Sequence, residues 1–317
     1  MPRFKDDVPQ GVIPAVLLPF FDDLSIDEAS YRSHLRDVCA ADGISAITTN
    51  AHASEVASCT FDEQRRVLDV TLDEVGSRVP VVAGIYADGS LEAQRLARMS
   101  TAAGASALLV FPSGIYTFGQ RPEMAVEHFR RIADATDLPL ILFQYPPPGG
   151  QGYPLPTLLR ICEEVPSVRA IKDWCANPLL HERQIRALQS LPRPVNVLST
   201  HSAWLMSSLV MGCKGLLSGS GSVIAALQAQ LFKAVQANDL ATARTLNDRI
   251  HPTAEVFYAE PWVDMHNRMK EALVLLGRLP RAVVRPPLAR IPADEIERIR
   301  KALVRAGLLD DKMRAVA

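Results

Sequence analysis

Residues 80–111 read PVVAGIYADGSLEAQRLARMSTAAGASALLVF, and this stretch decides the fold class. It opens and closes on short apolar runs, Pro80–Gly84 and Ala107–Phe111, which are nearly continuous in Val, Ile, Leu and Ala. Runs of this kind are typical of strands that are covered on both faces. Ser90 is a candidate N-cap for the amphipathic segment Leu91–Ala103 that lies between them. The stretch therefore predicts a strand, a helix and a second strand parallel to the first.

The same alternation covers most of the chain. Successive apolar runs begin 20 to 34 residues apart, which is the span of one strand and its following helix. The runs are Val12–Leu18, Ala46–Thr49, Pro80–Gly84, Ala107–Phe111, Pro139–Gln144, Val168–Lys172, Val195–Ser199 and Gly215–Ser218. Eight such units predict an α/β protein with a (β/α)8 TIM barrel. An open doubly wound sheet is the competing topology, but Pro19–Asp23 after the first run lacks the Gly-rich turn that such sheets carry.

Helix signals mark the units and the C-terminal part of the chain. Ser25–Glu28 and Thr60–Glu63 have the pattern of capping boxes. After residue 236 the strand pattern stops, and three further helices are expected at Leu240–Tyr258, Met265–Leu276 and Ala293–Ala306. The sequence thus predicts a barrel domain over residues 1–236 and a C-terminal helical extension over residues 237–317.

Composition excludes several classes of protein. The 317 residues are 48% hydrophobic, which is enough to bury a large core. A net charge of −1 without a basic block argues against nucleic acid or an anionic membrane as a partner. The apolar runs are shorter than the ~20 residues of a membrane span, and the first ten residues, MPRFKDDVPQ, do not resemble a signal peptide. Five cysteines without a CxxC pair predict neither a disulfide framework nor a zinc site, and a cytoplasmic location is expected.

Lys172 is the first candidate for chemistry. In a TIM barrel the active site lies at the C-terminal ends of the strands, and Lys172 closes the run Val168–Lys172. Only seven of the 34 basic residues are lysines, so one at a strand end is notable. Partial desolvation there would lower the pKa of the amine and make it a nucleophile toward a carbonyl group. The alternative is a lysine that reaches solvent or pairs with Asp173.

Other strand ends carry further candidates. The small residues around His52 and Ser54 would let backbone N–H groups converge on a carboxylate, although an ordinary surface loop would look similar. Phe143 and Tyr145 fall on the same side of their strand, where they could also form a simple aromatic cluster. His201 follows the seventh run, and the small-residue loop 218–222 follows the eighth.

These residues resemble a known family when taken together and in order. The matching segments are Gly11–Ala15, Val81–Gly84, Leu138–Pro146, Ile171–Asp173 and Gly215–Ser218. Over roughly residues 11–310 the chain resembles the dihydrodipicolinate synthase / N-acetylneuraminate lyase family of class I, Schiff-base aldolases. The resemblance implies a (β/α)8 barrel, a Schiff base between Lys172 and a 2-oxo acid, no metal or organic cofactor, and a homo-oligomer, either a dimer or a tetramer.

The chain also departs from the family pattern. Ala51–Glu55 stands where the family usually has Gly-Thr-Thr-Gly-Glu, and Phe143 stands at the place of the family's acid/base Tyr. The Arg that often grips a second carboxylate is absent from Pro146–Gly150. Tyr116 is a candidate substitute for a second family Tyr on the loop after the fourth strand. The resemblance therefore implies a divergent lyase that moves protons with another group than the family's Tyr.

The resemblance and the strand positions together assign candidate roles. Lys172 is the candidate nucleophile, and His52 is the preferred proton carrier, because an unperturbed His titrates near pH ~6.5; Tyr145 and His201 are its rivals. The candidate substrate-binding residues are Ala53, Ser54, Phe143, Thr200, His201, Leu217 and Ser218. The expected function is a Schiff-base lyase (aldolase, hydratase-aldolase or dehydratase) for a pyruvate-type 2-oxo acid, and not a true dihydrodipicolinate synthase. Decarboxylation or deamination by the same lysine, or a silent paralogue that only binds an oxo acid, are the alternatives.

Overall fold

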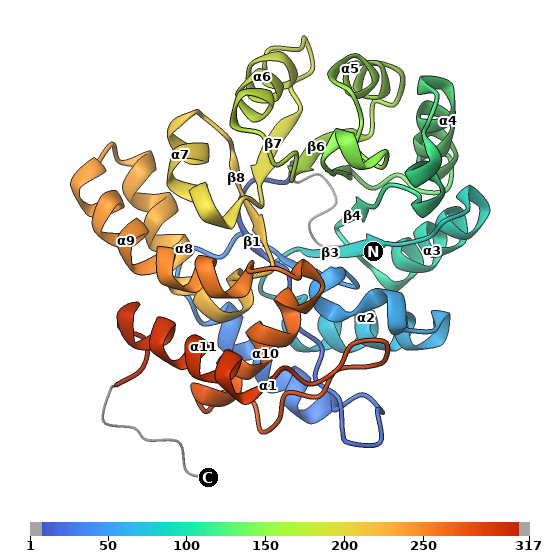
Figure 1. Ribbon diagram of the computed structural model, residues 1–317. Helices are drawn as coiled ribbons and strands as arrows, with labels where there is room; N and C mark the ends of the chain where they lie inside the picture. Colours follow the sequence, from blue (N-terminus) through green and yellow to red (C-terminus); the bar gives the residue numbers. More distant parts are fainter. Residues whose placement is uncertain (1–7, 311–317) are drawn as a thin grey trace.

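The barrel predicted from the apolar runs is confirmed by a computed structural model, which describes residues 8–310. Eight parallel strands are hydrogen-bonded in the order β1-β8-β7-β6-β5-β4-β3-β2, and the bridges Val12↔Ile44 and Ala15↔Thr48 bring the two ends of this order together. The strands are β1 Gly11–Pro14, β2 Ile47–Thr49, β3 Val81–Ile85, β4 Ala107–Val110, β5 Leu140–Gln144, β6 Val168–Asp173, β7 Asn196–Ser199 and β8 Gly215–Ser218. The result is a nearly closed (β/α)8 barrel (Figure 1).

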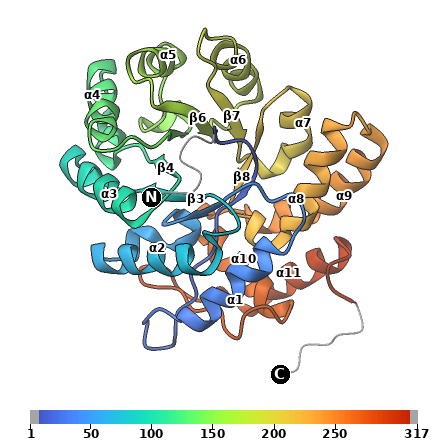
Figure 2. The ribbon, with the colours of Figure 1, turned by 180° about the vertical axis from the view of Figure 1, so that it is seen from behind.

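The helices follow the strands as expected. Figures 1 and 2 show them as a ring outside the barrel, with α9 to α11 added beside α8 and α1. The ring consists of α1 Glu28–Cys39, α2 Phe61–Val75, α3 Ser90–Ala103, α4 Pro122–Ala133, α5 Leu155–Glu164, α6 Pro178–Gln189, α7 Leu205–Val210 and α8 Gly221–Gln236. The extension consists of α9 Leu240–Phe257, α10 Met265–Leu275 and α11 Ala293–Arg305, within two residues of the expected bounds. Among residues 8–310, no helix combines the length and apolar character needed to cross a bilayer.

The observed N-caps of the helices can be compared with the caps that the sequence predicted. The Thr60 box is confirmed, because Thr60 accepts from the backbone of Glu63 and the Glu63 carboxylate accepts from the backbone of Thr60. The box expected at Ser25 is wrong: Asp27 caps α1 and accepts from Ser30 N at 3.0 Å. An Asp directly before the helix reaches the free N–H groups at its start, so the more distant Ser25 is not needed. Ser90 is the first residue of α3 and not its cap.

The first strand is shorter than its apolar run suggested. β1 ends at Pro14, yet residues 15–20 stay buried as they cross the mouth of the barrel. Hydrogen bonds to neighbouring strand ends hold this segment, with Ala15 N donating to Ser218 O and Val16 N to Thr48 O. An apolar run therefore indicated burial correctly but not strand length, because buried loops read in the same way.

A buried ion pair ties the C-terminal extension to the barrel. Lys270 of α10 is fully buried and its Nζ contacts Glu55 Oε1 in the loop after β2. The same ammonium donates to Val283 O at 2.7 Å, and Glu55 Oε2 accepts from Arg285 N at 2.9 Å. Further ion pairs cross the expected boundary between residues 236 and 237, namely Arg278–Asp37, Arg281–Asp27 and Arg285–Glu63. The division into two domains at that boundary stays a prediction.

Replacing Lys270 by Met should lower the free energy of unfolding by about 3–5 kcal/mol, because it leaves the buried Glu55 carboxylate without its counter-charge. The midpoint of urea unfolding measures the effect. Glu92→Gln, which breaks the exposed Glu92–Arg95 pair, is the matched control and should change stability by less than about 0.5 kcal/mol. Equal midpoints for the two variants would contradict the role given to the buried pair.

Candidate active site

Lys172 lies in the interior of the barrel at the end of β6. Its Cα pairs in register with Phe143 of β5 on one side and Leu198 of β7 on the other. The residue is only 5% exposed, and its Nζ lies 4.0 Å from the centroid of the Phe143 ring. Burial lowers the pKa of the ammonium to about 7, since the charged form loses its hydration. A large fraction of the amine is therefore neutral at neutral pH, as a nucleophile requires.

Two neighbouring cavities lie at the mouth of the barrel, and Lys172 lines the smaller one. This small cavity has a volume of about 30 Å³ and is lined by Ala15, His52, Ala53, Phe143, Lys172, Trp174, Thr200, Gly219, Tyr258, Met265 and His266. A second of about 420 Å³ lies between the loop after β2 and the C-terminal extension. His52, Trp174, Met265 and His266 line both, so the two spaces adjoin. The larger cavity is therefore the space next to the one at Lys172.

His52 and Tyr145, the two rival proton carriers, are hydrogen-bonded to each other. His52 Nε2 lies 2.8 Å from the Tyr145 hydroxyl, and the His52 ring packs on Phe111 with the centroids 4.8 Å apart. Tyr145 and Phe143 lie on the same side of the barrel wall with centroids 4.7 Å apart, as strand alternation predicted. The aromatic cluster and the hydrogen-bonded His52–Tyr145 pair are therefore parts of one arrangement.

Burial fixes the protonation states of this pair. It lowers the pKa of His52 to about 3, with a smaller effect from nearby Lys172, and it raises the pKa of Tyr145 above its usual range. The expectation that His52 titrates near its unperturbed value is therefore wrong, because the buried imidazole cannot be hydrated as a cation. At neutral pH the pair consists of a neutral imidazole and a phenol. Such a pair can pass a proton along its hydrogen bond, with either ring nitrogen serving as donor or acceptor.

The loop after β2 brings His52 and Ala53 to the small cavity. His52–Ser54 form a 3-10 turn, and Glu55 ends it in the left-handed conformation at φ 50°. The first amides of a helical turn have no acceptor within it, so those of His52 and Ala53 are the ones suited to an anion. Ser54 attaches the loop to the segment after β1, because its hydroxyl donates to Val16 O at 2.8 Å. Ala53 lines the small cavity, but Ser54 is not among its lining residues.

The residues expected from β7 and β8 separate into two groups. Thr200 lines the small cavity, and its backbone N–H donates to Asp173 O at 3.1 Å. Leu217 is buried in the core, and the Ser218 hydroxyl lies 2.9 Å from that of Ser220. Neither Leu217 nor Ser218 lines the small cavity. Gly219, the residue after Ser218, does line it.

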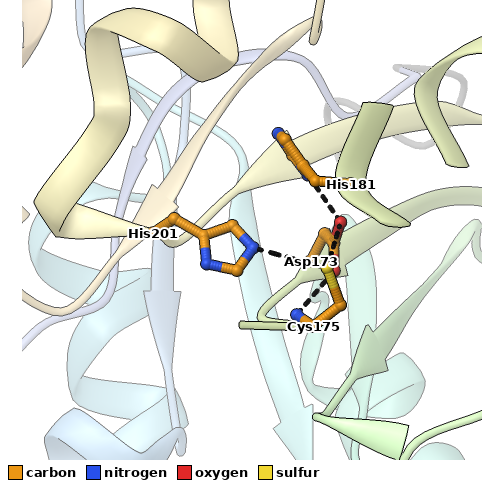
Figure 3. Close-up of side chains that lie close together, drawn as sticks. All are labelled: Asp173, Cys175, His181 and His201. Carbon is orange, nitrogen blue, oxygen red and sulfur yellow. Dashed lines mark hydrogen bonds and ion pairs between the residues drawn. The ribbon is translucent and has the colours of Figure 1, made fainter. Parts of the chain in front are cut away.

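His201 belongs to a buried cluster on the other side of β6. The potential ligand atoms of Asp173, Cys175, His181 and His201 lie within 4.8 Å of one another. Figure 3 shows these four side chains gathered around Asp173. These four side chains are of the types that bind zinc. The carboxylate of Asp173, however, already has three hydrogen-bond partners. These are His181 Nδ1 at 2.6 Å, Cys175 N at 2.8 Å and the Gln184 amide when its nitrogen faces Asp173. The Asp173 carboxylate is thus held in a hydrogen-bond network next to Lys172, whereas the buried His181 Nε2 has no hydrogen-bond partner among the described residues. The expected absence of a metal stays a prediction.

Sequence reasoning missed the residues that close the cavities. Trp174 could have been found, because it follows Lys172 by two positions and strand alternation puts both on one side. Tyr258, Met265 and His266 come from the C-terminal extension, and no motif marks them. The ring of Trp174 packs on that of Trp262, with centroids 5.5 Å apart, so the extension also shapes the entrance.

Comparisons with known proteins agree with the fold. The model of the dihydrodipicolinate synthetase family matches residues 8–306. The 4-hydroxy-tetrahydrodipicolinate synthase of Gluconacetobacter diazotrophicus is 30% identical over 303 residues, which are 95% of this chain and 98% of the relative. The enzyme of the same name from Nitrobacter hamburgensis is 31% identical, with the same coverage.

Solved structures are similar at lower identity. YagE, a prophage protein of the dihydrodipicolinic acid synthase family from E. coli K12, was solved in complex with pyruvate. It superposes with a TM-score of 0.89 at 22% identity and covers 96% of this chain and 100% of its own. A monomeric dihydrodipicolinate synthase variant superposes with a TM-score of 0.88, also at 22% identity, over 96% of this chain and 99% of its own.

The lowered pKa predicts how the reactivity of Lys172 depends on pH. Since only the neutral amine reacts, modification by a small anhydride should rise about tenfold per pH unit below pH 7 and level off above about pH 8. Peptide mapping by mass spectrometry measures the rate at Lys172. The urea-unfolded chain is the control, and there the rate should keep rising through pH 9, because an unburied lysine titrates near ~10.4. A native rate that still climbs tenfold between pH 8 and 9 would refute the shift.

Proposed function

The chain belongs to the dihydrodipicolinate synthetase family and is a lyase of the class I aldolase type, and on that premise we propose that it forms a Schiff base between Lys172 and a pyruvate-type 2-oxo acid. The observation that carries the proposal is the position of Lys172. Its amine is buried at the C-terminal end of a barrel strand, has a pKa lowered to about 7, and borders a cavity. A neutral, desolvated amine in that place is suited to attack a carbonyl carbon.

The steps follow from the groups around the lysine. The neutral amine adds to the C2 carbonyl, and the new C–N bond replaces the C=O π bond to give a carbinolamine. The carbinolamine oxygen takes up a proton and leaves as water, so that a protonated imine forms. Electrons from the C3–C4 bond, or from a C3–H bond, then flow into the imine, and the Tyr145–His52 pair exchanges the protons. The amides at the start of the 52–54 turn face the substrate carboxylate.

We propose a reaction other than 4-hydroxy-tetrahydrodipicolinate synthesis, the activity for which the relatives are named. Two features support the difference. Phe143 has no proton to give, and the phenol stands two residues later, at Tyr145, where it pairs with His52. The segment Pro146–Gly150 offers no cation for a second carboxylate. A retro-aldol, hydratase-aldolase or dehydratase reaction on a 2-oxo acid needs no cation for a second carboxylate, and the Tyr145–His52 pair would carry its protons.

The same proposal covers cofactors, assembly and location. The imine at Lys172 is itself the electron sink, so we propose that no metal or organic cofactor takes part. We further propose a homo-oligomer, because the 3-10 segment Gly114–Phe118 presents Ile115 and Phe118 to solvent, with Phe118 93% exposed. A cytoplasmic location is proposed from the cysteine pattern.

Borohydride reduction in the presence of 2-oxo acids tests the Schiff base. Intact mass should show one reduced adduct per chain with pyruvate, and the same adduct in the presence of EDTA. Lys172→Ala should abolish the adduct while its circular dichroism stays that of the folded protein. Lys214→Ala, at an exposed lysine, is the matched control and should keep the adduct. An adduct of full stoichiometry in Lys172→Ala would show that another residue forms the Schiff base.

Exchange of the C3 protons of pyruvate with D2O tests the Tyr145–His52 pair. His52→Ala should slow the exchange, followed by NMR, by about 10²–10⁴, the usual contribution of a general acid/base, while the Lys172 adduct still forms. Tyr145→Phe should slow it similarly, and the double variant should be little worse, because the two groups act through one hydrogen bond.

Phe143→Tyr in the His52→Ala background is the control, and it should not restore exchange. The outcome that contradicts the pair is near-normal exchange in His52→Ala together with slow exchange in Tyr145→Phe, which would assign the proton to the tyrosine alone.

A further inference from the structure

We propose that the larger cavity is a binding site for an aromatic ring carried beyond C3 of the 2-oxo acid, so that the substrate is an aryl-substituted 2-oxo acid and not a dicarboxylate or a sugar acid. The inference rests on the proposed function, since it assumes that the oxo group reacts with Lys172. It concerns a different part of the molecule from the Schiff base and can fail independently of it.

The position of the cavity defines which part of the substrate enters it. His52, Trp174, Met265 and His266 separate it from the small cavity over Lys172 and line both. On this proposal, a 2-oxo acid whose carbonyl carbon is at Lys172 directs the remainder of its chain past these side chains into the larger cavity. The larger cavity has a volume of about 420 Å³, in the range of sites that hold small organic ligands.

The cavity wall is mainly apolar and partly aromatic. Trp174 and Trp262 pack with their ring planes inclined by 53°. The Trp262 side chain is 44% exposed at the entrance of the cavity. A polar substrate would not bury this exposed apolar ring favourably, whereas an aromatic substrate would. The other apolar lining residues are Val56, Val263, Met265, Pro286, Pro287 and Leu288. Indole rings and a Met thioether make favourable contacts with a bound aromatic ring.

The charges around the cavity are already paired. Among the described residues that line it, Arg285 is the only arginine or lysine, and its guanidinium donates to Glu63, to Ser58 O and to Leu24 O. Glu55, the acidic residue of the wall, is bound to Lys270. A second carboxylate on the substrate would find no free cation, and a polyhydroxylated chain would lose hydration without replacement hydrogen bonds.

His266 supplies one polar contact in this apolar space. Its imidazole lies beside Gly219, and no described residue hydrogen-bonds to it. It borders both cavities, so it is placed to hydrogen-bond a hydroxyl group near the junction of the oxo-acid part and the ring. One polar group among apolar walls orients a ligand without favouring a charged one.

Trapping of the Lys172 adduct by borohydride with defined probes tests the inference. We compare pyruvate, 4-phenyl-2-oxobutanoate, 2-oxoglutarate and 2-oxo-3-deoxygluconate by the concentration that gives half-maximal trapping. The phenyl compound should reach it at a concentration about tenfold or more below that of pyruvate, because ring contacts add to burial of the phenyl group. The dicarboxylate and the sugar acid should need higher concentrations than the phenyl compound.

Variants of the entrance locate the preference. Trp262→Ala should reduce the ratio between pyruvate and the phenyl compound by about tenfold, and Trp262→Phe should retain most of it. Leu91→Ala, at an exposed apolar residue of α3, is the control and should leave the ratio unchanged. A wild-type ratio near one, or a preference for 2-oxoglutarate or for the sugar acid, overturns the inference while pyruvate trapping upholds the Schiff base. Absence of any adduct at Lys172 overturns the proposed function itself.

Discussion

The arrangement of the candidate site depends on the buried ion pair between Glu55 and Lys270. Glu55 ends the turn that carries His52, and Lys270 lies on the helix that carries Met265 and His266. A charge left unpaired in the interior would cost several kcal/mol, so the loop after β2 and α10 are held together wherever the chain is folded. The ion pairs Arg278–Asp37, Arg281–Asp27 and Arg285–Glu63 add to this attachment of the extension to the barrel.

The covered mouth then acts on each titratable group through desolvation. The same loss of hydration that lowers the pKa of Lys172 to about 7 lowers that of His52 and raises that of Tyr145. For the lysine this favours the neutral amine, and for the histidine and tyrosine it favours a neutral, hydrogen-bonded pair. One physical effect therefore sets the protonation states of the proposed nucleophile and of its proposed proton carriers together.

The differences from the family pattern are consistent with one another in this setting. Phe143 gives the Lys172 amine an apolar neighbour at 4.0 Å, and the phenol lies two residues further along the same side of β5. His52 replaces a small hydroxyl residue and reaches that phenol across the barrel mouth. Beyond them, the rings of Trp174 and Trp262 pack on each other at the larger cavity.

The sequence by itself determined the barrel, the order of its strands, the three added helices and the position of Lys172. These follow from periodic apolar runs and from strand alternation, which act between residues close in the chain. It also placed Phe143 and Tyr145 on one side correctly. Only the tertiary structure decided that His52 and Tyr145 are bonded, that His201 joins the Asp173 cluster, and that His266 and Trp262 close the cavities. Those contacts join residues up to some two hundred positions apart, as Glu55 and Lys270 are. Such contacts depend on tertiary packing and on the neutralisation of buried charges, and neither produces a periodic pattern in the sequence.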